Sequence, residues 1–152
     1  MAYRGKYVPE NPEKYKGDIK KITYRSLWER KFMRYCDAHP SIIEWSSEEL
    51  AVPYKSPVDR KMHRYFPDFI IKVRDKRSNI KTIMIEIKPA SQTKVLSAKH
   101  YLSETHWKKK RRKMKEFLTY KTNHAKWESA KVFCNRHNWE FKILTEKELN
   151  IK

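Results

Sequence analysis

The sequence lacks the features that would place the chain in a membrane or in an oxidising compartment. None of its apolar runs approaches the roughly 18 residues that a membrane-spanning helix needs, and its start has no apolar segment of the signal-peptide kind. The chain has two cysteines, no CxxC pair and six scattered histidines. We therefore expect no membrane span, no secretion and no zinc site, and we interpret Cys36 and Cys134 as buried thiols in a reducing compartment.

Acidic residues are scarce relative to basic ones. The chain has 36 lysines and arginines against 18 aspartates and glutamates, so its formal net charge is +18. Such an excess attracts polyanions, and nucleic acid is the obvious candidate. Five tryptophans, nine tyrosines and six phenylalanines argue against a disordered basic tail. The composition therefore predicts one folded basic domain, long enough for a core, and we see no internal repeat.

Two apolar runs around a charged turn make residues 65–89, YFPDFIIKVRDKRSNIKTIMIEIKP, the most informative segment. Branched apolar residues dominate both runs and RDKRSN separates them, which predicts a β-hairpin with a longer loop. Because strand side chains alternate between faces, Glu86 and Lys88 should share one face and Ile85 and Ile87 the other. A carboxylate and an ammonium side by side in so apolar a strand are costly unless they are paired or a metal is bound.

The remaining patterns predict helices around this hairpin. An apolar stripe predicts a helix over 24–39, and 41–58 indicates two short strands. Further along we expect a strand beginning near Met62, a loop or short helix over 90–100, a basic helix within 104–123, a helix over 123–137, a strand over 139–144 and a short helix over 145–149. Residues 1–22 indicate an irregular basic arm, ordered against the body or a partner, and 23–152 the domain itself. This order predicts an α/β (α+β) fold, a mixed β-sheet with a central hairpin, flanked by helices.

Asp68 and Glu86 stand on either side of the hairpin turn, so they can face each other on adjacent strands. Two carboxylates that converge in a partly dry pocket repel, and one takes up a proton unless a cation intervenes. A hard divalent cation such as Mg²⁺ suits these oxygen ligands, and Lys88 could orient or deprotonate a metal-bound water or stabilise charge on a phosphate. An internal ion pair of Lys88 with Glu86 or Asp68 is the structural alternative.

Glu29 has two interpretations. Ser26 followed by Glu29 matches the S-x-x-E capping box at the start of a helix. At about 100° per residue, Glu29 also projects close to Cys36 at the border of the apolar stripe, and could point towards the charged face of the hairpin.

Basic side chains form a second candidate site. Seven of the eight residues from Lys108 to Lys115 are basic, and Arg64 lies just before the hairpin segment, beside Asp68. The run predicts a helix that contacts phosphates without reading sequence, although a solvated helix face or a localisation-type patch would look the same. The predicted DNA-binding residues are Arg64, Lys108, Lys109, Lys110, Arg111, Arg112, Lys113 and Lys115.

Pro67-Asp68 followed by Glu86-Ile87-Lys88 resembles the motif of the PD-(D/E)xK nuclease superfamily, whose core is restriction-endonuclease-like. The series RSLWERKF, IIEW, ELAVPY, RYFPDFII, IEIKP and WEFKILTEKEL is similar to the TnsA-type catalytic domain. The resemblance implies a metal-dependent endonuclease that hydrolyses double-stranded DNA with Mg²⁺, for which Mn²⁺ could substitute, and with no small-molecule cofactor.

The same resemblance assigns roles to individual residues. Asp68, Glu86 and the backbone carbonyl of Ile87 would bind the metal, Lys88 would act on the attacking water, and Glu29 would support this metal or a second one. Gln92 stands where some members of the superfamily have an accessory polar residue.

Within the superfamily, the chain most resembles nucleases of phage head completion in its small size, its basic arm and its sequence. That similarity implies action on packaged DNA or its end before tail attachment, portal or neck proteins as candidate partners, and a location in the virion head and the host cytoplasm. The alternative is a head-assembly protein that binds DNA or the portal on a nuclease-like scaffold without catalysis. RNA binding has only the charge in its favour.

Overall fold

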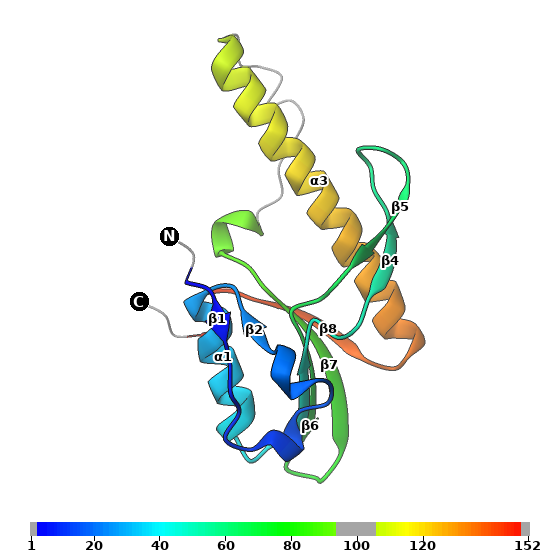
Figure 1. Ribbon diagram of the computed structural model, residues 1–152. Helices are drawn as coiled ribbons and strands as arrows, with labels where there is room; N and C mark the ends of the chain where they lie inside the picture. The colour runs from blue at the N-terminus through cyan, green and yellow to red at the C-terminus, as the bar shows by residue number, and fades with distance from the viewer. Residues whose placement is uncertain (1–2, 94–105, 150–152) are drawn as a thin grey trace.

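The computed structural model describes residues 3–93 and 106–149 (Figure 1). Its elements follow in the order β1 (Gly5–Lys6), η1 (Pro12–Lys14), η2 (Ile19–Lys21), β2 (Thr23–Tyr24), α1 (Leu27–Ala38), β3 (Ile42–Ser47), β4 (Val52–Lys55), β5 (Met62–Tyr65), β6 (Phe69–Arg74), β7 (Ile80–Ile87), η3 (Ala90–Gln92), α3 (Trp107–Arg136) and β8 (Glu140–Leu144), where η denotes a 3₁₀ helix. Within these residues, none of the helices has the length and apolar character needed to cross a membrane.

Four strands form the central sheet, in the order β3-β6-β7-β8. β6 pairs antiparallel with both β3 and β7, and β8 joins β7 in parallel. The hairpin register places Phe69 opposite Ile85 and Ile71 opposite Ile83, which are the apolar cross-strand pairs that stabilise a sheet. The predicted mixed sheet with a central hairpin, and with IIEW in an edge strand, is therefore confirmed.

The two faces of the sheet carry separate apolar cores. Because side chains alternate along β7, Ile85 and Ile87 pack with α1 and the N-terminal segment, whereas Met84 packs with α3. The first core also contains Phe32, Met33, Cys36, Trp45 and Phe69, and the second contains Val52, Tyr54, Tyr65, Trp127, Ala130 and Cys134. Both cysteines are buried free thiols, as predicted.

Residues 3–22, which the sequence sets apart as a basic arm, lie against the body of the domain. β1 pairs antiparallel with β2, and the first core includes Tyr15 and Ile22 from this segment. Asp37 of α1 anchors the segment. Its buried carboxylate accepts hydrogen bonds from the Tyr7 hydroxyl at 3.0 Å and from the consecutive backbone N–H groups of Glu10 and Asn11 at 2.7 and 3.0 Å. A buried carboxylate with three donors is well satisfied.

A single helix of 30 residues, α3, stands where the sequence predicts two. The sequence TYKTN between the predicted helices contains neither glycine nor proline, so nothing there ends the helix. The hydroxyls of Thr119 and Thr122 instead donate hydrogen bonds to the backbone carbonyls four residues earlier, those of Lys115 and Leu118. At about 1.5 Å per residue the helix is about 45 Å long. Its C-terminal half packs on the sheet and its N-terminal half extends beyond the body (Figure 1).

β4 and β5 form a separate antiparallel hairpin beside α3, and β5 begins at Met62 as predicted. Tyr54 and Tyr65 from this hairpin are buried in the second core. The ammonium of Lys126 on α3 lies 5.8 Å from the centre of each of these two rings. The packing holds Tyr65 against the end of β7, where it contacts Glu86.

The segment after β7 is described only in part, and the segment after β8 differs from the prediction. Residues 90–100 begin with η3, but 94–105 lie outside the described residues, as do 150–152. The short helix predicted over 145–149 is wrong: these residues form one turn, in which the N–H of Leu149 donates to the carbonyl of Thr145 at 3.2 Å. The capping contact does form, because the Glu148 carboxylate accepts from the N–H of Thr145.

Candidate active site

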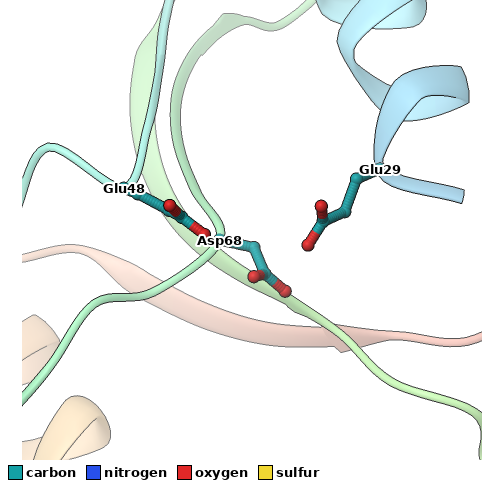
Figure 2. Close-up of side chains that lie close together, drawn as sticks. All are labelled: Glu29, Glu48 and Asp68. Carbon is teal, nitrogen blue, oxygen red and sulfur yellow. The ribbon is translucent and has the colours of Figure 1, made fainter. Parts of the chain in front are cut away.

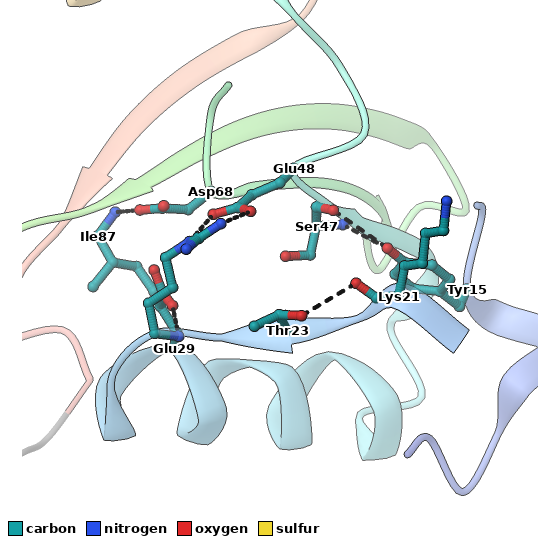
Figure 3. A network of polar contacts seen from close by, with 9 residues as sticks. Tyr15, Lys21, Thr23, Glu29, Ser47, Glu48, Asp68 and Ile87 are labelled. Carbon is teal, nitrogen blue, oxygen red and sulfur yellow. Dashed lines mark hydrogen bonds and ion pairs between the residues drawn. The ribbon is translucent and has the colours of Figure 1, made fainter. Parts of the chain in front are cut away.

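Asp68 lies between the fully buried Pro67 and the first residue of β6. Its Oδ2 accepts a hydrogen bond from the backbone N–H of Ile87 at 2.8 Å, which ties the end of β7 to the start of β6 (Figure 3). Burial, followed by the negative charges of Glu86 and Glu29, raises the pKa of Asp68 to about 8. Such a carboxylate is costly to ionise without a cation nearby.

Glu86 is buried near the end of β7 and is contacted by two side chains. The Tyr65 hydroxyl donates a short hydrogen bond to Oε2, and the Lys88 ammonium lies 3.8 Å from Oε1. Burial raises the pKa of Glu86, whereas Tyr65 and Lys88 act in the opposite direction. The Glu86–Lys88 ion pair that the sequence leaves open is therefore present, but its length exceeds that of a hydrogen bond.

Both interpretations of Glu29 hold. The Ser26 hydroxyl accepts from the N–H of Glu29 at 3.1 Å, and the Glu29 carboxylate accepts from the backbone N–H of Arg25, one residue before the N-cap. The same carboxylate points towards Asp68 (Figure 2), and burial raises its pKa. The cap of α1 therefore fixes the Glu29 side chain in an orientation that faces Asp68.

Glu48, which no motif in the sequence marks, completes this group (Figure 2). It follows β3 directly, and its N–H donates to the carbonyl of Asp68 at 3.3 Å. Its φ of 54° is uncommon for a residue other than glycine. The register that places Ser47 opposite Phe69 brings Glu48 beside Asp68. Strand register was the signal that could have identified it, and the sequence alone does not supply that register.

Arg25 lies at the solvent-exposed edge of the group. Its Nε and Nη2 donate to Oε1 and Oε2 of Glu48 at 3.0 and 3.1 Å, drawn as the dashed lines that reach Glu48 in Figure 3. These hydrogen bonds raise the pKa of Arg25. The side chain of Arg25 is 52% exposed and that of Glu48 28%, so the pair stabilises the fold by about 1 kcal/mol or less.

Glu29, Glu48 and Asp68 together fit a hard divalent cation. One carboxylate oxygen from each lies within 4.8 Å of the others, and carboxylate oxygens are the ligands that Mg²⁺ prefers. Glu86, the predicted partner of Asp68, does not belong to this group among residues 3–93 and 106–149; its oxygens contact Tyr65 and Lys88 instead. Burial, followed by the charges of neighbouring carboxylates, raises the pKa values of Asp68 and Glu29, and a cation would offset both causes.

Comparison with known proteins places the chain in a family. The sequence model of the TnsA-like endonuclease N terminal family matches residues 39–146. The chain belongs to the TnsA-like endonucleases. The matched residues include Glu48, Asp68, Glu86 and Lys88, whereas Glu29 precedes them. The family confirms the predicted nuclease superfamily and the restriction-endonuclease-like fold class.

This TnsA-like chain is also similar to a protein named "Head completion nuclease" from Enterobacteria phage T4. The two are 40% identical over 149 residues, which cover 98% of this chain and 95% of the phage T4 protein. The similarity therefore extends over α1 and the N-terminal segment, which the family match does not reach.

The predicted DNA-binding residues of the TnsA-like chain lie in two places. Arg64 on β5 is exposed, and its guanidinium lies 5.8 Å from the centre of the Phe66 ring. The basic run from Lys108 to Lys115 lies on the N-terminal half of α3, which projects away from the sheet (Figure 1). All of its basic side chains are exposed except that of Lys113, which is half-buried. Arg64 is thus close to Asp68 along the chain, while the run is displaced from the acidic group.

Gln92 lies on η3 at the base of this projection. It lines a pocket of about 540 Å³ together with Arg112 and Lys115 of α3. Gln92, for which the resemblance suggests an accessory role, therefore faces the basic helix.

Proposed function

We propose that this chain is a divalent-metal-dependent DNA endonuclease that acts in phage head completion. The observation that carries the proposal is the convergence of Glu29 and Glu48 on Asp68, whose pKa is raised to about 8, in a member of the TnsA-like endonucleases. Half-buried carboxylates that converge in this way repel one another, so a cation among them would be favoured, and perturbed acids of this kind are typical of functional sites.

Asp68 is the central residue of the proposed metal site. Glu29 and Glu48 are its neighbours in the structure, and Glu86 with the backbone carbonyl of Ile87 are the further ligands that the family motif implies. A bound Mg²⁺, or Mn²⁺ in its place, would polarise the phosphodiester and lower the pKa of a coordinated water. The N–H of Ile87 holds the Asp68 carboxylate in position.

Lys88 is the proposed residue for the attacking water and the phosphate. Glu86 holds its ammonium at 3.8 Å, too far for a hydrogen bond, so its three N–H donors are available to a water molecule or a phosphate oxygen. Tyr65 in turn holds Glu86 in place, because its hydroxyl donates a hydrogen bond to the other carboxylate oxygen, Oε2. The role of Lys88 is therefore to orient the nucleophile and to stabilise negative charge on the phosphate.

Double-stranded DNA is the proposed substrate, held by phosphate contacts from Arg64 and the basic run of α3. A net charge of +18 favours such contacts, which supply affinity without sequence readout. The setting follows from the name of the phage T4 relative. We therefore assign the protein to the virion head and the host cytoplasm, with packaged DNA or its end as the target before tail attachment and portal or neck proteins as candidate partners.

A plasmid-nicking assay tests this function. Supercoiled plasmid is incubated with the protein in Mg²⁺, in Mn²⁺ or in EDTA, and the Asp68→Asn and Glu86→Gln variants are compared with a Glu44→Gln control on β3. We expect nicking in both metals, none in EDTA, a loss of at least about 100-fold in both site variants and no change in the control. Equal nicking in EDTA, or by both site variants, would contradict the proposal. Heads completed by an Asp68→Asn phage would favour the non-catalytic assembly protein.

A further inference from the structure

Arg25 forms an ion pair with Glu48, which is itself one of the three carboxylates of the acidic group formed by Glu29, Glu48 and Asp68. This contact gives Arg25 a role beyond stability. We propose that Arg25 is an exchangeable counter-ion: its guanidinium holds Glu48 while the site is free of metal, and releases it when a divalent cation binds. The inference rests on the proposed function, because it concerns the regulation of the same metal site.

The contacts of Arg25 place it on two of the three carboxylates. Its guanidinium occupies both oxygens of Glu48, at 3.0 and 3.1 Å, and its backbone N–H donates to the carboxylate of Glu29. One oxygen of Glu48 lies within 4.8 Å of oxygens of Glu29 and Asp68. A cation that binds between these oxygens therefore meets the positive charge of Arg25 at its edge, and the two cations repel.

Only movement can relieve that repulsion. A guanidinium stays charged at any pH at which the protein is folded, so Arg25 cannot lose its proton as a lysine could. Its side chain is 52% exposed, and an ion pair so open to solvent is held weakly. Rotation of the side chain into water is therefore easy, whereas Glu29 and Asp68 are held by backbone N–H groups.

The released guanidinium would lie at the mouth of the site, where a DNA phosphate approaches. The planar fork that now binds both oxygens of Glu48 matches a phosphate equally well. Metal binding would thus free Arg25 for the substrate, and phosphate binding to Arg25 would free Glu48 for the metal. Two such events favour each other by the same factor.

Isothermal titration calorimetry of Mn²⁺ binding to the DNA-free protein tests this exchange, and it does not depend on nuclease activity. Arg25→Gln removes the competing charge and should tighten Mn²⁺ binding by about tenfold. Glu48→Gln removes a ligand and should weaken binding by about tenfold or more. Lys72→Gln is the matched control, because Lys72 pairs with Glu44 at 3.3 Å on the same sheet with similar exposure, 39% and 33%; it should leave Mn²⁺ affinity unchanged.

Unchanged or weaker Mn²⁺ binding by Arg25→Gln would overturn the inference, since Arg25 would then support Glu48 rather than compete for it. Unchanged binding by Glu48→Gln would also overturn it. Thermal unfolding in EDTA shows whether each variant is folded. If Arg25→Gln is not, Arg25→Lys keeps the charge but loses the fork, and should still bind Mn²⁺ a few-fold more tightly than the wild-type protein.

Asp68→Asn separates this inference from the proposed function. If Asp68→Asn abolishes Mn²⁺ binding and nicking while Arg25→Gln does not tighten binding, only the exchange is wrong. If Asp68→Asn still binds Mn²⁺ and still nicks DNA, the metal site itself is wrongly placed.

Discussion

Asp68→Asn should stabilise the metal-free protein, and the gain should grow as the pH rises. Asparagine has nearly the same shape and keeps an oxygen that can accept the N–H of Ile87, so the substitution removes the charge with little change in packing. In the wild-type protein, burial and the charges of Glu86 and Glu29 raise the pKa of Asp68 from 3.8 to about 8. Between these values the folded protein binds a proton that the unfolded chain has lost.

The wild-type protein therefore loses stability as the pH rises. The contribution of Asp68 is intact below its unfolded pKa of 3.8, decreases as the pH rises through the folded value of about 8, and stays low above it. One pKa unit corresponds to about 1.4 kcal/mol, so the rise sets an upper limit of roughly 6 kcal/mol on the loss. Relaxation and water penetration reduce such penalties, so we expect Asp68→Asn to gain ~3 kcal/mol near pH 9 and less than ~1 kcal/mol near pH 4.

Urea unfolding in EDTA at several pH values between about 4 and 9 measures this gain. Glu44→Gln removes a more exposed carboxylate from the same sheet and should change the free energy of unfolding by less than about 1 kcal/mol at every pH. If Asp68→Asn is less stable than the wild-type protein near pH 9, the ionised carboxylate is stabilised by its contacts. The reasoning from burial would then be refuted.

Three other variants test neighbouring parts of the molecule. Tyr65→Phe removes the hydroxyl that holds Glu86 and should slow nicking about 10- to 100-fold; an unchanged nicking rate would show that this contact does not position Glu86. Asp37→Ala leaves the half-buried Tyr7 hydroxyl and two backbone N–H groups without their acceptor, so we expect a loss of about 3 kcal/mol in the free energy of unfolding and faster proteolysis within residues 3–22; equal protection would contradict the anchoring. The double change Lys109→Gln and Arg112→Gln should weaken duplex binding at all sequences and lower its salt slope by about 2, and a loss confined to particular sequences would argue against phosphate contacts.

The hairpin was predictable because its pattern is local. Alternation placed Ile85 and Ile87 in one core and Glu86 on the other face, and the turn residues marked where the strands separate. Ser26 and Glu29 likewise follow from their spacing, since a capping box involves only neighbours in sequence. Family resemblance added the chemical roles, which the pattern alone does not contain.

Other features depend on contacts between distant segments, and the sequence could not supply them. Glu48 reaches Asp68 only through the β3–β6 register and a left-handed backbone. Glu86 turns to Tyr65 because the β4–β5 hairpin packs beside α3, which no local pattern indicates. The prediction of two helices where the structure has the single helix α3 was wrong for a different, local reason. A change from a basic to an apolar stripe does not end a helix when no glycine or proline lies between the two parts.

Cleavage by the Asp68→Asn protein at a DNA occupancy equal to that of the wild-type protein is the most direct measurement of the proposed chemistry. Supercoiled plasmid is saturated with each protein in Mg²⁺, binding is measured in parallel, and the rate of nicking per bound protein is compared. We predict full binding and a rate at least about 100-fold lower for the variant. A rate within about twofold of the wild-type rate would contradict an active site centred on Asp68.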